Sequence, residues 1–272
     1  MSLFPPAGRH LVAALVVLAP IGAQAQPGPV LVDSVVAALR VGEQAETALA
    51  SMQMRLGTGD PLFSPDAVAD SVRVRLLADA RPDELADALV FLRSPAFGRL
   101  LDRAQANAQD PMATARVALG IDTPKKGTLA DSLLAARYVD AAGTARQMTT
   151  ILERSMRAVV ETVPAARADL ERRGQTAEEA IAETVGQLGE QMGPLYVASA
   201  RVGLAGVPPG EVEAAIAYYA SPAGQYVTRA LTDGTLAAVL PGIVQWATAM
   251  ASAPPPSFPE EASPPAKPLG KP

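Results

Sequence analysis

The sequence predicts an all-α protein, and three observations favour that fold class. Hydrophobic residues make up 49% of the 272 residues and aromatic residues only 4%, an alanine-rich composition that suits closely packed helices. Apolar residues recur at steps of three and four, the spacing of one helix face. Proline follows serine or begins an apolar stripe at several places, as in the first turn of helices. We expect two related helical-bundle repeats, the second larger, and a Pro-rich tail.

Residues 1–25 have the layout of a secretory signal peptide. Arg9 precedes the apolar run 11–19, and Ala23-Gln24-Ala25 forms a small-x-small cleavage site. The run is shorter than the roughly 20 apolar residues that a spanning helix needs. An uncleaved anchor or a buried first helix is the alternative. We therefore predict cleavage after Ala25, a periplasmic or secreted product, and no transmembrane span after cleavage.

The charge balance and the missing residue types exclude several classes of function. The chain has 23 basic and 28 acidic residues, a net charge of −5, which argues against nucleic acid as a partner because phosphate binding needs a positive face. It has no cysteine, and its one histidine, His10, leaves with the signal peptide. Cysteine nucleophiles, histidine-based triads and zinc or haem ligation by these residues are excluded. We expect no catalytic, cofactor-binding or metal-binding residues.

The first repeat is predicted over residues 27–119. Apolar spacing from Pro27 to Leu56 indicates one helix face. A second helix should start at Ser64-Pro65, where serine can cap and proline fits the first turn. A third should begin at Pro82, and Ser94-Pro95 should send the next helix off at a new angle. The apolar face of the third helix is expected to consist of Leu85, Leu89 and Leu92.

A linker is predicted at residues 120–127 and a second repeat at 128–250. Thr128 and Asp131 form a plausible capping box. A stripe from Leu134 to Val163 then gives the longest helical signal in the chain, which Pro164 should kink or end.

The rest of the second repeat is punctuated by caps and prolines. Thr176 with Glu179 is a better capping box, and the helix that it opens should break at Gly193-Pro194. A helix over 209–219 should end at Ser221-Pro222, and a last helical region should run to about Met250. The face of the 209–219 helix is expected to consist of Val212, Ile216 and Tyr219.

Residues 251–272 form a Pro-rich C-terminal tail. Eight prolines and few apolar side chains occur there, so the segment cannot form a core and is expected to be disordered. A ligand for a proline-reading partner is the alternative.

Two segments of the chain, 82–96 and 209–223, align without a gap. Proline, glutamate, serine and proline match at fixed offsets, and Phe91 lies opposite Tyr218. Gly98 lies four residues after Ser94 and Gly224 three residues after Ser221, so these two glycines match only after a shift of one residue. The match predicts a duplicated helical unit, the second copy enlarged.

The second copy, with Tyr218-Tyr219-Ala220-Ser221-Pro222-Ala223-Gly224-Gln225, resembles the bacterial domain-of-unknown-function family 2059 of exported helical proteins. The resemblance is specific over about residues 195–235. The first copy departs from it, because Leu92 replaces the second aromatic residue and Phe97 is inserted before the glycine. The resemblance implies fold and export, and it implies no activity.

The shared motif is the candidate binding or packing site. A packing corner explains it better than a ligand site, because serine can cap, proline fits a first turn, and Gly224 lets another helix come close. The candidate residues are Phe91, Ser94, Pro95, Tyr218, Tyr219, Ser221, Pro222 and Gly224.

Charged residues offer weaker candidates. Glu84 and Glu211 are equivalent in the repeat and could work as acid and base if they faced each other, but a carboxylate in a first turn also favours the helix dipole. The other two groups are best explained as solvated helix faces: the acidic Glu178, Glu179 and Glu183, and the basic Arg146, Arg154 and Arg157.

The expected function is therefore a non-enzymatic, exported helical protein that binds a protein partner or an apolar ligand. A carboxylate-dependent hydrolase is the first alternative. A membrane-surface protein is the second, although the net negative charge argues against it.

Overall fold

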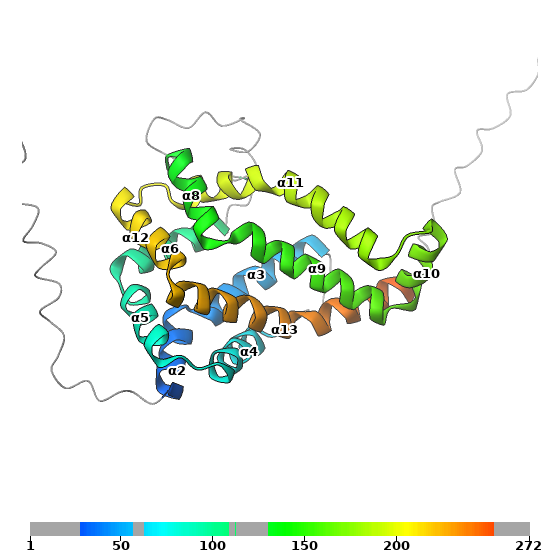
Figure 1. Cartoon of the computed structure of the whole chain (residues 1–272), viewed down its shortest axis with the longest axis horizontal. Helices are drawn as coiled ribbons and strands as arrows, with labels where there is room; N and C mark the ends of the chain where they lie inside the picture. Colours follow the sequence, from blue (N-terminus) through cyan, green and yellow to red (C-terminus); the bar gives the residue numbers. More distant parts are fainter. Residues whose placement is uncertain (1–27, 57–62, 109–111, 113–129, 253–272) are drawn as a thin grey trace, which may run out of the picture.

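The computed structural model describes residues 28–56, 63–108, 112 and 130–252. Within these ranges all regular elements are α-helices, so the all-helical prediction is confirmed (Figure 1). The predicted signal peptide, the 120–127 linker and nearly all of the predicted tail lie outside the described residues. The first half of the chain contributes α2 (Gly28–Ala38), α3 (Val41–Leu56), α4 (Pro65–Ala78), α5 (Pro82–Leu92) and α6 (Pro95–Ala108). The second half contributes α8 (Ser132–Ala142), α9 (Thr144–Thr162), α10 (Pro164–Arg173), α11 (Ala177–Gly203), α12 (Pro209–Ala220) and α13 (Pro222–Ser252).

Helix starts are the features that the sequence predicted best. Proline is the first residue of α4, α5, α6, α10, α12 and α13, where its missing N–H needs no partner. The capping box is present at Thr176, whose hydroxyl accepts from the Glu179 backbone while the Glu179 carboxylate accepts from the Thr176 backbone. At α8 the cap is Asp131 itself, which accepts from the Leu134 backbone at 3.0 Å.

Two predicted long helices, 27–56 and 134–163, are each broken into two. The chain turns at Arg40, with φ 49°, and at Gly143, with φ 64°, in the left-handed region that ends a helix. Each turn is closed by a glutamine: the Gln44 side chain donates to the Leu39 carbonyl at 2.5 Å, and the Gln147 side chain to the Ala142 carbonyl at 2.6 Å. Apolar spacing did not reveal either turn; the stripe through Gly143, for example, continues in steps of three and four residues at Tyr138, Ala141, Ala145 and Met148.

The predicted break at Gly193-Pro194 is wrong. Helix α11 continues through Pro194, and α13 likewise continues through Pro241. An internal proline removes one helix hydrogen bond and crowds the preceding turn, but tertiary packing on both sides of it maintains the helix.

The helices of the two halves pair in the same way. In the first half α4 packs on α2 and α3, and α5 packs on α2; in the second half α11 packs on α8 and α9, and α12 packs on α8. The last helix of each half crosses into the other: α6 packs on α11 and α12, and α13 packs on α4 and α5. The halves therefore interlock, and the predicted architecture of two related helical-bundle repeats is not confirmed. Helix α10 has no counterpart among the described residues of the first half.

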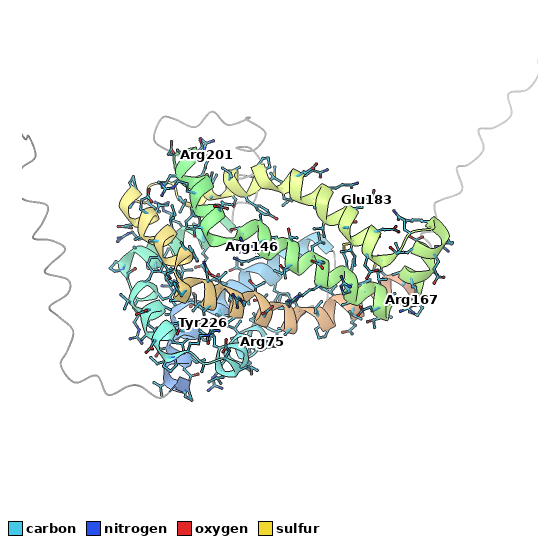
Figure 2. All side chains as sticks on the ribbon, viewed as in Figure 1. Arg75, Arg146, Arg167, Glu183, Arg201 and Tyr226 are labelled. Atoms are coloured by element: carbon cyan, nitrogen blue, oxygen red, sulfur yellow. The ribbon has the colours of Figure 1, made fainter. Side chains whose placement is uncertain are left out.

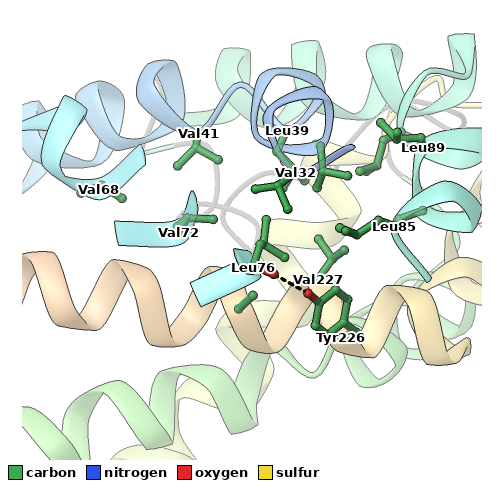
Figure 3. Packing of buried hydrophobic residues seen from close by; sticks show 14 of the residues in the cluster. Val32, Leu39, Val41, Val68, Val72, Leu76, Leu85, Leu89, Tyr226 and Val227 are labelled. Carbon is green, nitrogen blue, oxygen red and sulfur yellow. Dashed lines mark hydrogen bonds between the residues drawn. The ribbon is translucent and has the colours of Figure 1, made fainter. Parts of the chain in front are cut away.

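The larger core combines residues of both halves (Figure 3). Val32, Leu76 and Leu85 from the first half are fully buried and pack with Val227 of α13. The Tyr226 hydroxyl of α13 donates to the Leu76 carbonyl at 2.9 Å. Burying each such aliphatic side chain contributes about 1.5–3 kcal/mol, so α13 is fixed to the first half mainly by apolar packing.

Helices α4 and α13 cross closely at a glycine. A Cβ added at Gly234 would lie 2.6 Å from the Cα of Val72. That distance is far shorter than a carbon–carbon contact, so the crossing requires glycine at this position.

The second half extends beyond this core as an arm formed by α9, α10 and residues 177–195 of α11 (Figure 1). Helix α9 has no fully buried residue along its length, and Met148 on it is 45% exposed. Arg146, Arg167 and Glu183 mark the three helices of the arm in Figure 2. The arm is thus packed less densely than the first half.

Helix α13 is the one described helix that is long and apolar enough to cross a membrane by length and composition, with a mean hydropathy of 1.3 over its best window. It packs on α4, α5, α9 and α12, and its Asp233 pairs with Arg154 of α9 at 2.8 Å. These contacts place α13 within the helical assembly.

Candidate functional site

The two Ser-Pro corners have the same local geometry. The Ser94 hydroxyl accepts from the Phe97 backbone at 3.2 Å, and the Ser221 hydroxyl accepts from the Gly224 backbone at 3.0 Å. Each bond satisfies a free N–H in the first turn of the next helix, which begins at Pro95 or Pro222. The corners are therefore helix caps, as the packing interpretation predicted.

The glycine of the second corner lets another helix come close, as predicted, and that helix is α12. A Cβ at Gly224 would lie 2.0 Å from the Tyr218 carbonyl oxygen. Gly98 has open space around it, and Phe97 occupies the position of the first corner that corresponds to Gly224. Gly234 is a second glycine at a close helix crossing.

Five aromatic rings gather where the two corners meet. Phe91 of α5 stacks on Tyr218 of α12 with centroids 4.5 Å apart, and its edge meets Phe97 at 5.4 Å. Tyr219 lies 5.3 Å from Tyr218 and 5.7 Å from Tyr138 of α8. Phe91 and Tyr218, which align in the repeat, are thus in direct contact across the interlocked halves.

The buried face of α12 differs by register from the predicted one. Val212, Ala215 and Tyr218 are the buried residues, while Ile216 and Tyr219 are half-buried beside them. The prediction for α5 is confirmed, since Leu85, Leu89 and Leu92 are all buried.

The two neighbouring tyrosine hydroxyls have different environments. Those of Tyr219 and Tyr138 are hydrogen-bonded to each other. The Tyr218 hydroxyl is buried and has no hydrogen-bond partner among the described residues. Burial raises the pKa of Tyr218 and of Tyr219 above the usual value for tyrosine, because the phenolate would lose its solvation. Both therefore remain neutral at physiological pH.

A pocket of about 180 Å³ lies beside this aromatic cluster, between α6, α8, α9 and α11. Tyr138 belongs to both features. None of the described residues that line the pocket is charged; four carry hydroxyls, namely Tyr138, Thr144, Tyr196 and Ser199, and the others are aliphatic or glycine, namely Leu100, Ala104, Val139, Ala200, Gly203 and Leu204. No sequence pattern indicates this pocket, because these residues come from four separated helices and form no chemically distinctive motif.

The two candidate carboxylates do not form an acid–base pair. Glu211 of α12 accepts from two guanidinium nitrogens of Arg99 on α6, with one contact at 2.8 Å. Glu84 of α5 lies 3.9 Å from Arg81, which also pairs with Asp79. Each carboxylate is therefore paired with an arginine and not with the other carboxylate.

Three of the other six charged candidates form ion pairs on the surface. Arg154 pairs with Asp233, and Arg157 pairs with Glu178 at 3.3 Å. Among the described residues, no group of three or more acidic or histidine side chains is placed to hold a metal ion. These residues therefore contribute to the surface charge pattern.

No protein-family model, curated protein or solved structure matches the chain. The resemblance to family 2059 stays a prediction from the residues at the second corner, and function has to be argued from the site itself.

Proposed function

We propose that this chain is a non-enzymatic exported protein that binds an apolar ligand. The observation that carries the proposal is the pocket between α6, α8, α9 and α11, whose lining is mostly apolar and includes four residues with hydroxyl groups. Small-molecule sites commonly have this form, a concave apolar surface with few polar groups. The ion-paired Glu84 and Glu211 support binding over hydrolysis. Export is supported by the predicted signal peptide.

The proposal is tested by native mass spectrometry of protein purified without detergent from the exported fraction. We expect the intact protein to carry an additional small mass that denaturation releases, and to begin at Gln26. Ala104 is exposed and lines the pocket, so Ala104→Leu should fill the pocket and abolish the additional mass. Identical masses before and after denaturation, together with no binding of any added apolar compound, would rule the proposal out.

A protein partner is the second candidate, favoured by one observation. Helix α9 exposes Met148 and has no fully buried residue, so its apolar stripe is only half covered. Crosslinking through a photoreactive residue at position 148, with one at exposed Arg167 as control, distinguishes the candidates: a discrete partner should couple at position 148 only.

A further inference from the structure

Two residues that line the pocket lie at the same offsets from a turn and from a helix cap as two residues in or against the larger core. The glutamine-closed turns relate Arg40 to Gly143, so Val41 corresponds to Thr144, the residue that follows each turn. Val41 is buried in the larger core, whereas Thr144 lines the pocket.

The serine caps relate α13 to α6 in the same way. Leu231 and Ala104 each lie ten residues after the capping serine. Leu231 packs against the larger core, whereas Ala104 lines the pocket. At these two offsets, therefore, valine and leucine lie in or against the larger core, whereas threonine and alanine line the pocket.

The size of the pocket limits its occupant. Its volume is about 180 Å³, and an apolar cavity of about 150 Å³ in another protein holds one benzene molecule. A single substituted ring fits this volume, whereas a long acyl chain would extend out of it.

The charge of the lining limits the occupant further. None of the described lining residues carries a charged side chain, and burying a carboxylate or phosphate without a partner costs several kcal/mol. A neutral molecule is therefore favoured strongly over an anion of the same shape.

Two hydroxyl groups of the lining are open to a ligand. The Tyr138 hydroxyl is hydrogen-bonded to Tyr219. The side chains of Tyr196 and Thr144 also line the pocket, and neither forms a hydrogen bond with another described residue there. Partial burial raises the pKa of Tyr196, so it stays a neutral donor. A ligand with one polar group could bond to it, and the rings of Tyr138 and Tyr196 favour an aromatic body.

We propose that the pocket binds a small neutral aromatic molecule with one hydrogen-bonding group, of the size and chemistry of a simple phenol or indole. The proposal rests on the proposed function and narrows its ligand class. The side chain at position 104 sets the space, and the Tyr196 hydroxyl selects the polar group.

The test titrates the purified protein at pH 7 with p-cresol, toluene, benzoate and decanoate, followed by NMR chemical shifts and calorimetry. Phenols with a pKa of about 10 are neutral at this pH and carboxylates are not. We expect p-cresol to bind one to one and benzoate to bind about tenfold or more weakly. Ala104→Leu should weaken the binding of p-cresol and of toluene about tenfold or more. Ala106→Leu, at an exposed alanine outside the lining, should change neither affinity.

Tyr196→Phe isolates the polar contact. It should weaken the binding of p-cresol about fivefold, the effect of one hydrogen bond, and leave the affinity for toluene unchanged. Tighter binding of benzoate or decanoate than of p-cresol would overturn the inferred ligand class but leave apolar binding standing. If Ala104→Leu left the binding affinity unchanged, the inferred location of the binding site would be wrong. Absence of binding by all four compounds would contradict the proposed function as well.

Discussion

The two halves of the chain use the same helix pairings but fill them differently. In the first half α2, α3 and α4 surround fully buried residues such as Val35 and Val72, and α13 closes the group along the Gly234 crossing. In the second half α8, α9 and α11 leave a pocket beside α6. Helix α6 ends at Ala108. One helix arrangement can thus be filled by side chains or leave a pocket, depending on side-chain size at a few positions.

The largest expected effect concerns the crossing that fixes the filled half. Gly234→Ala should lower the free energy of unfolding by about 3 kcal/mol, because its Cβ would overlap the Val72 backbone and α13 would have to move. Urea denaturation measures this loss. Gly186→Ala is the control: it lies in α11 with open space around it, so replacing a helical glycine should raise stability by about 0.5–1 kcal/mol. Equal effects of the two substitutions would contradict the close crossing.

The next effect compares the corresponding positions of the filled and hollow halves. Leu231→Ala should cost about 2 kcal/mol, because a leucine packed on the larger core is truncated. Ala104→Leu should instead stabilise the free protein by about 1 kcal/mol, because its added carbons enter an existing cavity. Thermal and urea unfolding of both variants provide the comparison. Destabilisation by Ala104→Leu as large as that by Leu231→Ala would mean that the hollow is already filled.

A smaller difference is expected between the adjacent tyrosines. Tyr219→Phe removes the hydrogen bond with Tyr138 and should cost about 1 kcal/mol. Tyr218→Phe removes a buried hydroxyl that has no described partner and should leave stability unchanged or slightly higher. The ring stacking on Phe91 survives in both variants, so urea denaturation reports the hydroxyls alone. The opposite ranking would show that Tyr218 has a hydrogen-bond partner.

The smallest effect is expected at the candidate carboxylate. Glu211→Gln weakens an ion pair with Arg99, whose side chain is 52% exposed, and such pairs contribute about 0–1 kcal/mol. The unfolding midpoint should therefore move little, and raising the salt concentration should reduce the difference between variant and parent. A loss above about 2 kcal/mol would indicate a structural role that an exposed pair does not have.

The sequence predicted those features that depend on local chemistry. Proline and capping residues marked the helix starts at Pro82, Pro95 and Pro222, and the Thr176–Glu179 capping box was confirmed. Helix interruptions were predicted poorly, because a left-handed residue at Arg40 leaves the apolar spacing intact, and Pro194 lies in a helix maintained by its neighbours.

The site was only partly predictable. The Ser-Pro corners were found as a repeated motif and are helix caps, but the pocket beside them depends on how α6, α8, α9 and α11 pack. Thr144 and Ala104 are unremarkable residues in the sequence. They become significant only when their counterparts Val41 and Leu231 are known to lie in or against a core. Such a comparison requires the fold, because the interlocking of the halves is not encoded in any single segment.

The most direct test of a filled half beside a hollow one is the thermal unfolding midpoint of the parent protein and of Ala104→Leu, each with and without p-cresol. A ligand at about 100 times its Kd stabilises a folded protein by about 2.7 kcal/mol. We expect the parent midpoint to rise by several degrees with p-cresol, and Ala104→Leu to start higher and respond much less. An equal response of both proteins, or none in the parent, would contradict the account.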